Sequence, residues 1–349
     1  MKPITFLLIS IILLCTVGLA QWTPQQSGTT ARFRGVSAVS PMVAWASGSA
    51  GTYARTTDGG ATWNSSVVQG AAQLDFRDVQ AVDANTAYLL SIGPGEASKI
   101  YKTTDGGRGW TLQFNNKNPK AFFDAFAFWD ARTGIAMSDP VDGRFILIKT
   151  TDGGATWEEL PRENLPEAIQ GDGGFAASGT CIAVQGKKNV WFVSGGGATA
   201  RVFRSTDGGE TWKDAVTPIT AGNASSGIFS IAFKDAKNGV IAGGDYRKEN
   251  EAGNNIAITT DGGATWTLAK GTRPSGFRSA VAFVPGTRGP IVVAVGPSGS
   301  DYSVDNGTNW VSLGSMGFHA VSFASDDSGW AVGEGGRIAE FALPRDQKR

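Results

Sequence analysis

One eight-residue pattern, Ser/Thr-x-Asp-x-Gly-x-x-Trp, recurs six times along the chain. Its paired aspartates and tryptophans are Asp58 and Trp63, Asp105 and Trp110, Asp152 and Trp157, Asp207 and Trp212, Asp261 and Trp266, and Asp305 and Trp310. Successive aspartates lie 47, 47, 55, 54 and 44 residues apart. A repeat of this period indicates one small structural unit per copy, which buries its apolar face only by stacking on its neighbours.

Each copy of the octapeptide closes a unit of similar pattern. An apolar segment such as 33–39 or 277–283 opens the unit, and a small-residue segment such as 43–48 follows. A third short segment enters the octapeptide and a fourth leaves it. Glycine makes up 48 of the 349 residues, which suits a chain with many turns. A four-stranded unit of about 47 residues has the size of a β-propeller blade.

The seventh unit is divided between the two ends of the chain. Residues 318–343 supply three strands with no octapeptide after them, and residues 21–27 resemble the segment that leaves an octapeptide, with Trp22 as its tryptophan. Joining the ends completes a blade and removes two open sheet edges. The 329 residues from 21 to 349, divided by seven, give 47. We therefore predict an all-β, seven-bladed β-propeller over residues 21–349.

The first twenty residues have the pattern of an export signal. Lys2 precedes an apolar core over residues 6–14, and a small-x-small triplet ends at Ala20. This predicts a signal peptide over residues 1–20, cleaved before Gln21, and a secreted or periplasmic protein. A retained membrane anchor is the alternative, although the apolar core is shorter than the ~20 residues of a membrane span. Cleavage leaves Cys181 as the single cysteine, which excludes an intramolecular disulfide.

Charge and residue usage exclude several classes of function. Lysine plus arginine and aspartate plus glutamate number 31 each, so no net charge favours nucleic acid. His319 is the single histidine, which rules out a histidine-rich metal centre. No phosphate loop or dinucleotide fingerprint occurs, and we predict no cofactor and no metal. A monomer with no membrane span after cleavage is expected.

The residue types of the octapeptide indicate a structural role. The aspartate can accept hydrogen bonds from turn amides, glycine tolerates positive φ, and the Ser/Thr hydroxyl adds a local bond. The tryptophan ring can pack on the blade. Since each unit holds one such carboxylate, shared metal or catalytic chemistry is not expected. We predict that the octapeptides stabilise hairpins.

The octapeptide sequence TTDGGATW, at residues 56–63, 150–157 and 259–266, resembles the Asp-box (BNR) signature. That signature is found in sialidases, sortilin-type receptors, xyloglucan-cleaving glycoside hydrolases and the photosystem II assembly/stability-factor family. The last family is also similar in its seven blades and in the phrase Gly-Trp-Ala-Val-Gly, here residues 329–333. This resemblance implies a propeller and, for that family, a role in holding a partner protein through an arginine-rich surface.

Loop lengths predict that one face of the propeller is elaborated over blades three to five. The loops between second and third strands are longest at residues 138–144, 194–201 and 243–255, and the blade-joining segments 158–174 and 213–227 are also long. Their candidate binding residues are Asp139, Asp142, Arg144, Asp245 and Tyr246. Non-repeat residues gathered on one face favour a binding surface. Solvated loops without a ligand are the alternative.

A second candidate site is the mouth of the central channel on the same face. Aligning the blades on Trp45, Tyr88 and Trp330 places Arg34, Arg77 and His319 at equivalent positions. Arg278 follows the same Phe-Arg start, and the equivalent residue of blade three is Asp124. Converging cations can hold a carboxylate or phosphate. Alternatively, the arginines pair with Asp75, Asp78 or Asp124.

These features predict an exported binding or assembly scaffold whose ligand is a protein or an acidic or glycan ligand. The alternative is a glycoside hydrolase with two carboxylates drawn from Asp139, Asp142, Asp172 and Asp245. A sialidase motif is not supported, because Ile-Pro does not follow Phe33-Arg34 and Phe-Arg recurs in later blades.

Overall fold

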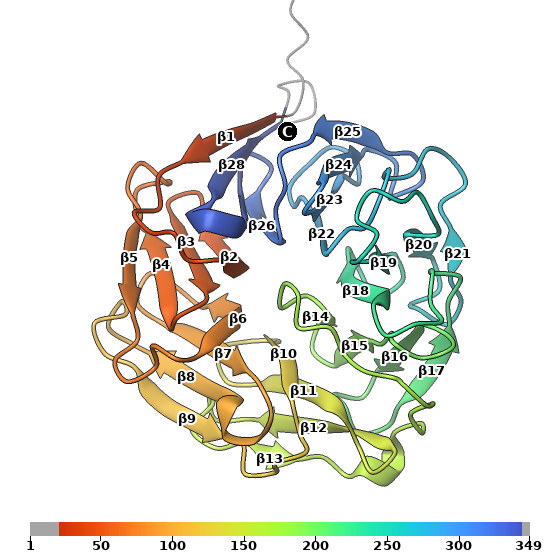
Figure 1. Cartoon of the computed structure of the whole chain (residues 1–349), viewed down its shortest axis with the longest axis horizontal. Helices are drawn as coiled ribbons and strands as arrows, with labels where there is room; N and C mark the ends of the chain where they lie inside the picture. Colours follow the sequence, from red (N-terminus) through yellow and green to blue (C-terminus); the bar gives the residue numbers. More distant parts are fainter. Residues whose placement is uncertain (1–20, 344–349) are drawn as a thin grey trace, which may run out of the picture.

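The computed structural model describes residues 21–343, which form seven four-stranded antiparallel sheets arranged in a ring (Figure 1). The predicted signal peptide and residues 344–349 lie outside the described residues. Within residues 21–343, no helix has the length and apolar character needed to cross a membrane. The seven-bladed all-β propeller predicted from the repeat is confirmed.

In blades 1 to 6 the strands run outward from the axis in chain order, whereas blade 7 takes its outermost strand from the N-terminal end of the described chain (Figure 1). Blade 1 comprises β2 (Phe33–Ser40), β3 (Val43–Gly48), β4 (Thr52–Thr56) and β5 (Asn64–Val67). Blade 2 comprises β6 (Asp75–Ala81), β7 (Ala87–Ile92), β8 (Lys99–Thr103) and β9 (Thr111–Asn115). Blade 3 comprises β10 (Phe123–Phe128), β11 (Gly134–Val141), β12 (Arg144–Thr150) and β13 (Glu158–Glu159). Blade 4 comprises β14 (Ile182–Gln185), β15 (Asn189–Val193), β16 (Arg201–Ser205) and β17 (Lys213–Val216).

The remaining blades complete the ring. Blade 5 comprises β18 (Ser226–Phe233), β19 (Gly239–Asp245), β20 (Ile256–Thr259) and β21 (Thr267–Leu268). Blade 6 comprises β22 (Ala280–Phe283), β23 (Val292–Gly296), β24 (Gly299–Ser303) and β25 (Val311–Gly314). Blade 7 comprises β26 (Ala320–Ser325), β27 (Ser328–Val332), β28 (Ile338–Ala342) and β1 (Gln21–Gln25). Three short 3-10 helices lie in loops: η1 (Gly95–Ala97), η2 (Arg162–Asn164) and η3 (Glu334–Gly336).

The two ends of the described chain close the ring as predicted. β1 pairs antiparallel with β28, and Trp22 lies opposite Phe341. The Trp22 ring is buried, its centroid lies 4.9 Å from those of both Phe318 and Phe341, and its Nε1 donates to Ser300 Oγ of blade 6 at 2.7 Å. This strand therefore joins blade 7 to blade 6 as well as completing blade 7.

The octapeptides form the local hydrogen bonds that their residue types predict. In the first copy, Thr56 Oγ1 donates to Asp58 Oδ1 at 2.8 Å, and Asp58 Oδ1 accepts from the Thr62 amide at 2.9 Å. The Gly60 amide donates to Thr56 Oγ1 at 2.9 Å, from a residue with φ of +84°. The hydroxyl-to-aspartate bond recurs in all six copies.

The octapeptides also bind the preceding blade, which the sequence did not predict. Tyr53 Oη donates to the Gly107 carbonyl at 2.7 Å, and Tyr88 Oη donates to the Gly153 carbonyl at 2.8 Å. Trp191 Nε1 donates to the Gly262 carbonyl at 2.9 Å. In each case a side chain of one blade caps the octapeptide turn of the next blade. The octapeptide therefore contacts the preceding blade in addition to stabilising its own hairpin.

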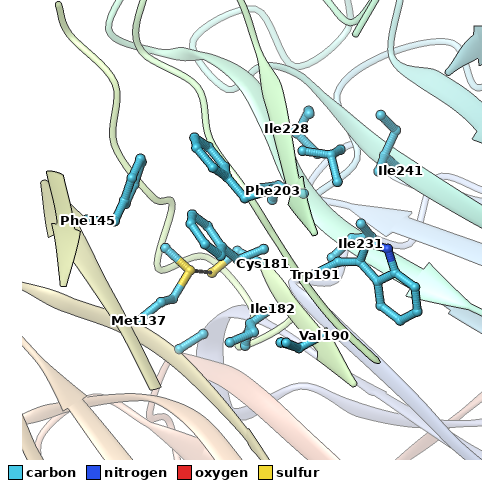
Figure 2. Close-up of a cluster of buried hydrophobic side chains, with 14 of the residues drawn as sticks. Met137, Phe145, Cys181, Ile182, Val190, Trp191, Phe203, Ile228, Ile231 and Ile241 are labelled. Atoms are coloured by element: carbon cyan, nitrogen blue, oxygen red, sulfur yellow. Dashed lines mark hydrogen bonds between the residues drawn. The ribbon is translucent and has the colours of Figure 1, made fainter. Parts of the chain in front are cut away.

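Apolar side chains fill the spaces between blades. Figure 2 shows one such cluster, where Met137 and Phe145 of blade 3 face Cys181 and the blade 4 residues, and Ile231 of blade 5 continues the cluster. Cys181 is a buried free thiol whose Sγ lies 3.9 Å from the Met137 sulfur. Cohesion within residues 21–343 therefore rests on packing and strand pairing.

Thr150→Val tests the structural role of the octapeptide, because it keeps the side-chain shape and removes the hydroxyl. The buried Thr150 Oγ1 donates to Asp152 and accepts from the buried Gly154 amide at 2.9 Å. We expect the free energy of unfolding to fall by about 1–3 kcal/mol, since that amide loses its acceptor. Urea unfolding measures the change. Thr151→Val, at the exposed neighbouring position, is the control and should unfold at the wild-type midpoint.

Candidate binding site at the channel mouth

The register of the strands places one residue from each blade around the mouth of the central channel. In blade 1, Arg34 lies in a bulge between Phe33, which pairs with Gly48, and Gly35, which pairs with Ser47. Matching bulges, or backbone hydrogen bonds at the start of the first strand, define a set called here the mouth ring: Arg34, Arg77, Asp124, Thr180, Phe229, Ser279 and His319. A bulge re-aims the side chain it carries. The predicted equivalence of Arg34, Arg77, Asp124 and His319 is confirmed.

A cavity of about 590 Å³ opens among these residues. Its polar wall, from blades 1, 2 and 7, consists of Arg34, Arg77, His319 and Glu334. Its aromatic wall, from blades 4, 5 and 6, consists of Phe175, Phe229, Phe277 and Tyr246. The inner strands that carry or adjoin these residues surround the centre of the ring in Figure 1. We call this space the mouth cavity.

The polar wall contains two buried nitrogen atoms without hydrogen-bond partners. Neither Arg34 Nε nor His319 Nδ1 has a hydrogen-bond partner among the described residues. His319 Nε2 lies 2.8 Å from Glu334 Oε1, and an Arg34 guanidinium nitrogen lies 3.7 Å from the same oxygen. Burial, together with the charges of Arg77 and Arg32, lowers the pKa of Arg34 to about 10. An anion in the mouth cavity would relieve the repulsion between these guanidinium groups.

His319 is neutral at neutral pH. Burial, followed by the charge of Arg34, lowers the pKa of its imidazole to about 4. The charged groups of the polar wall are therefore Arg34, Arg77 and Glu334, and His319 contributes a neutral hydrogen-bonding group.

Arg77 is partly committed to the protein itself. Its Nε lies 2.9 Å from Asp75 Oδ2, and the same oxygen lies 3.2 Å from Arg32. Another Arg77 nitrogen donates to the Ala176 carbonyl at 3.0 Å. The predicted alternative, in which arginine pairs with Asp75, thus holds for Arg77. Asp75 contributes one negative charge and Arg32 and Arg77 contribute two positive charges, so these three groups together are net positive.

The aromatic wall was not predicted from the sequence. Phe229 occupies the mouth-ring position that arginine occupies in blades 1 and 2. Phe175 stacks on Phe229 with ring centroids 3.8 Å apart and planes at 7°, and Phe277 contacts Phe229 edge-on at 4.6 Å. Tyr246 adds its ring at 6.1 Å from Phe229. Aligning blade 5 on the start of its first strand would have shown Phe229 among the arginines.

Residues 173–180, called here the crossing segment, span the channel beneath the cavity. The Gly174 amide donates to Asp139 Oδ1 of blade 3 at 2.7 Å, and Ser178 Oγ donates to the Ser279 carbonyl of blade 6 at 2.9 Å. The crossing segment lies against Asp124, since a Cβ on Gly174 would come within 2.6 Å of Asp124 Oδ2. Asp124 and Asp139 are consequently outside the cavity lining.

Burial in this layer disfavours the ionised carboxylates. It raises the pKa of Asp139 to about 6, and burial together with the charge of Asp139 raises the pKa of Asp124 well above its usual range. These two aspartates hold the crossing segment in place rather than facing a ligand.

Arg278 does not join the other cations, and strand register explains why. The backbone amide of Phe33 donates to the preceding blade at Gly333, but in blade 6 the corresponding donor is Arg278, which bonds Gly243. Ser279 therefore takes the position of Arg34, and Arg278 takes the position of Phe33. Arg278 is 2% exposed, and its Nε donates to Asp301 Oδ2 at 2.7 Å. The alignment by the Phe-Arg pair was wrong by one residue.

The candidate loop residues are placed apart from one another. Asp142 lies at the exposed β11–β12 turn, where it pairs with Lys120 at 2.9 Å. Arg144 bonds the Leu165 carbonyl and Glu167, and Asp245 accepts from Ser225 at 2.7 Å. Tyr246 alone among these loop residues lines the mouth cavity.

The aspartates considered for glycoside hydrolysis do not converge on this cavity. Asp139 is beneath the crossing segment, and the buried Asp172 pairs with Arg201. None of Asp139, Asp142, Asp172 and Asp245 is in the lining of the mouth cavity, whose carboxylates are Glu249 and Glu334.

Asp78 gives a pH-dependent prediction. This buried carboxyl accepts from the Phe126 amide at 2.8 Å, and burial raises its pKa to about 8. Because the folded-state pKa of Asp78 is raised, its carboxyl group stabilises the folded state fully at pH values below its unfolded-state pKa, near 4. That contribution to stability is lost as the pH rises through the folded-state pKa of about 8. We expect wild type to lose roughly 1.4 kcal/mol per pH unit within this window relative to Asp78→Asn. Urea unfolding from pH 4.5 to 8.5 measures the difference; parallel curves for the two proteins would contradict it.

Comparisons with known proteins agree with this architecture. The BNR/Asp-box repeat model matches residues 203–214. A structure described as YCF48 bound to D1 peptide is 20% identical, covers 92% of this chain and 97% of its own, and has a TM-score of 0.64. YCF48 from Cyanidioschyzon merolae is 18% identical, with coverage of 92% and 99% and a TM-score of 0.64.

More distant propellers share the fold as well. U3-55K is 12% identical over 93% of this chain and 98% of its own, with a TM-score of 0.62. A search of curated proteins by sequence gave no match. These similarities, together with the six octapeptides and the seven sheets, support one assignment. The chain folds as a seven-bladed β-propeller that carries Asp-box (BNR) repeats, and its fold is similar to that of YCF48.

Proposed function

We propose that the chain is an exported protein-binding scaffold and that its mouth cavity binds an acidic segment of a partner protein. The observation that carries this proposal is the convergence of Arg34 and Arg77 on the lining of the mouth cavity, where their like charges repel. A carboxylate bound between the two guanidinium groups would offset this repulsion through charge-assisted hydrogen bonds. The similarity in fold to YCF48, solved with a D1 peptide, supports a peptide as the ligand class.

The size of the mouth cavity suits a short segment. About 590 Å³ lies within the usual range of ligand pockets, which hold a few side chains rather than a folded domain. The elaborated loop with Tyr246 borders the cavity, so further contacts with a partner can extend over this face.

Charge reversal tests the role of the polar wall. The probe is a fluorescein-labelled decapeptide rich in aspartate, and binding is followed by fluorescence anisotropy. We expect Arg34→Glu with Arg77→Glu to weaken binding by at least about tenfold, since two charge-assisted contacts become repulsive. Arg132→Glu, at an exposed position away from the cavity, is the matched control.

Two further measurements complete the test. Circular dichroism and thermal unfolding establish that the double variant is folded, because Arg77 also bonds the Ala176 carbonyl. An acidic oligosaccharide is included as a competitor, and preference for it over every acidic peptide would overturn the protein-binding proposal. Equal peptide binding by wild type and the double variant would also overturn it.

Export rests on the residue pattern of 1–20 and has its own test. The protein is expressed with its full sequence in a bacterial host, and the mass of the periplasmic fraction is measured. We expect a mature chain that begins at Gln21. Recovery of the intact chain in the membrane fraction would instead establish a retained anchor.

A further inference from the structure

We propose that the aromatic wall is a second subsite of the mouth cavity, which takes a large apolar side chain adjacent to the acidic group of the bound segment. This inference rests on the proposed function and adds the ligand's chemistry. The segment recognised is then both acidic and apolar, and a purely acidic segment binds weakly.

The position of the aromatic wall within the ring supports this division. Arg34, Arg77 and His319 come from blades 1, 2 and 7, whereas Phe229 stands at the same mouth-ring position in blade 5. One side of the mouth cavity therefore carries the two guanidinium groups with Glu334 beside Arg34, and the other side is aromatic. A ligand that satisfies both sides carries a negative charge and an apolar group a short distance apart.

The aromatic cluster is separate from the packing of the blades. Ala177, Phe229 and Phe277, with Phe175 against them, form a cluster distinct from the larger inter-blade cores. Tyr246 is 40% exposed, although it lies beside the buried Phe229. Large aromatic side chains gathered at a cavity wall offer area for a ligand side chain and a preferred edge-to-face geometry.

The crossing segment fixes this wall against the polar wall. It carries Phe175, while its Ala176 carbonyl accepts from Arg77 and its Gly174 amide is bound by Asp139. The stacked pair Phe175 and Phe229 is thus linked to the arginine side of the cavity through the hydrogen bond of the neighbouring Ala176 carbonyl. Because both walls are preorganised relative to each other, the spacing between the ligand's two groups is part of the recognition.

The test compares two labelled decapeptides that differ at one residue. The first contains a phenylalanine flanked by aspartates, and the second has alanine in place of the phenylalanine. We expect wild type to bind the first peptide about tenfold more tightly, as burial of one aromatic side chain implies. In Tyr246→Ala and in Phe175→Ala, this preference should fall to about twofold or less.

Controls separate this inference from the proposed function. Leu112→Ala, at an exposed apolar position on an outer strand, should keep the tenfold preference. Thermal unfolding verifies that each variant is folded. Equal binding of both peptides to wild type, with binding still lost in the Arg34 and Arg77 double variant, would overturn the aromatic subsite and leave the proposed function standing. Failure of both peptides to bind would overturn the proposed function and this inference with it.

Discussion

Replacing Trp22 by alanine is expected to lower the free energy of unfolding by about 3–5 kcal/mol. The buried indole lies between Phe318 and Phe341 in blade 7 and donates to Ser300 in blade 6. Its removal leaves a cavity and an unpaired hydroxyl acceptor at the strand that closes the ring. Urea unfolding followed by tryptophan fluorescence and circular dichroism measures the loss.

The control for Trp22 is the exposed Gln26→Ala, which lies just beyond the same strand and should unfold at the wild-type midpoint. A loss below about 1 kcal/mol for Trp22→Ala, the size of an average substitution, would mean that ring closure depends little on β1. In that case β1 pairing with β28 would be a peripheral contact.

Arg278→Met is expected to cost about 3–5 kcal/mol, because it leaves Asp301 buried without its cation. The Arg278 Nε and a terminal nitrogen lie 2.7 and 2.6 Å from Asp301 Oδ2, and both side chains are almost wholly buried. Burial raises the pKa of Asp301 despite the nearby guanidinium, so desolvation outweighs the attraction of Arg278 at this carboxyl group. The measurement is the urea unfolding midpoint at pH 7.

The double variant Arg278→Met with Asp301→Leu provides the discriminating comparison. Replacing both ions with apolar residues removes the uncompensated charge, so most of the lost stability should return. If the double variant is as unstable as the single one, then lost packing rather than an unpaired charge explains the effect.

The sequence predicted the fold because the repeat constrains each blade locally. The aspartate, glycine and hydroxyl of each octapeptide are within a few residues of one another, so their hydrogen bonds follow from residue type and spacing. The divided seventh blade followed from counting strands, and β1 pairing with β28 confirms it. The contacts from Tyr53 or Tyr88 to the next octapeptide could not be predicted, since they join residues more than fifty positions apart.

The candidate site was predicted in part. Arg34, Arg77 and His319 were placed together because each follows the start of a first strand with the same bulge or register. Arg278 was misplaced, since a one-residue difference in register moves a side chain to the other face of a strand. The sequence does not mark where that register changes.

By itself, then, the sequence determined seven blades, the hairpins and the joining of the two ends, because those depend on short-range residue patterns repeated at a constant period. The tertiary structure alone decided what faces the channel mouth. Strand register put Arg278 inside blade 6, and the crossing segment covered Asp124 and brought Phe175 onto Phe229. Those outcomes depend on contacts between distant segments, whose relative placement is set by packing in three dimensions and not by neighbouring residues.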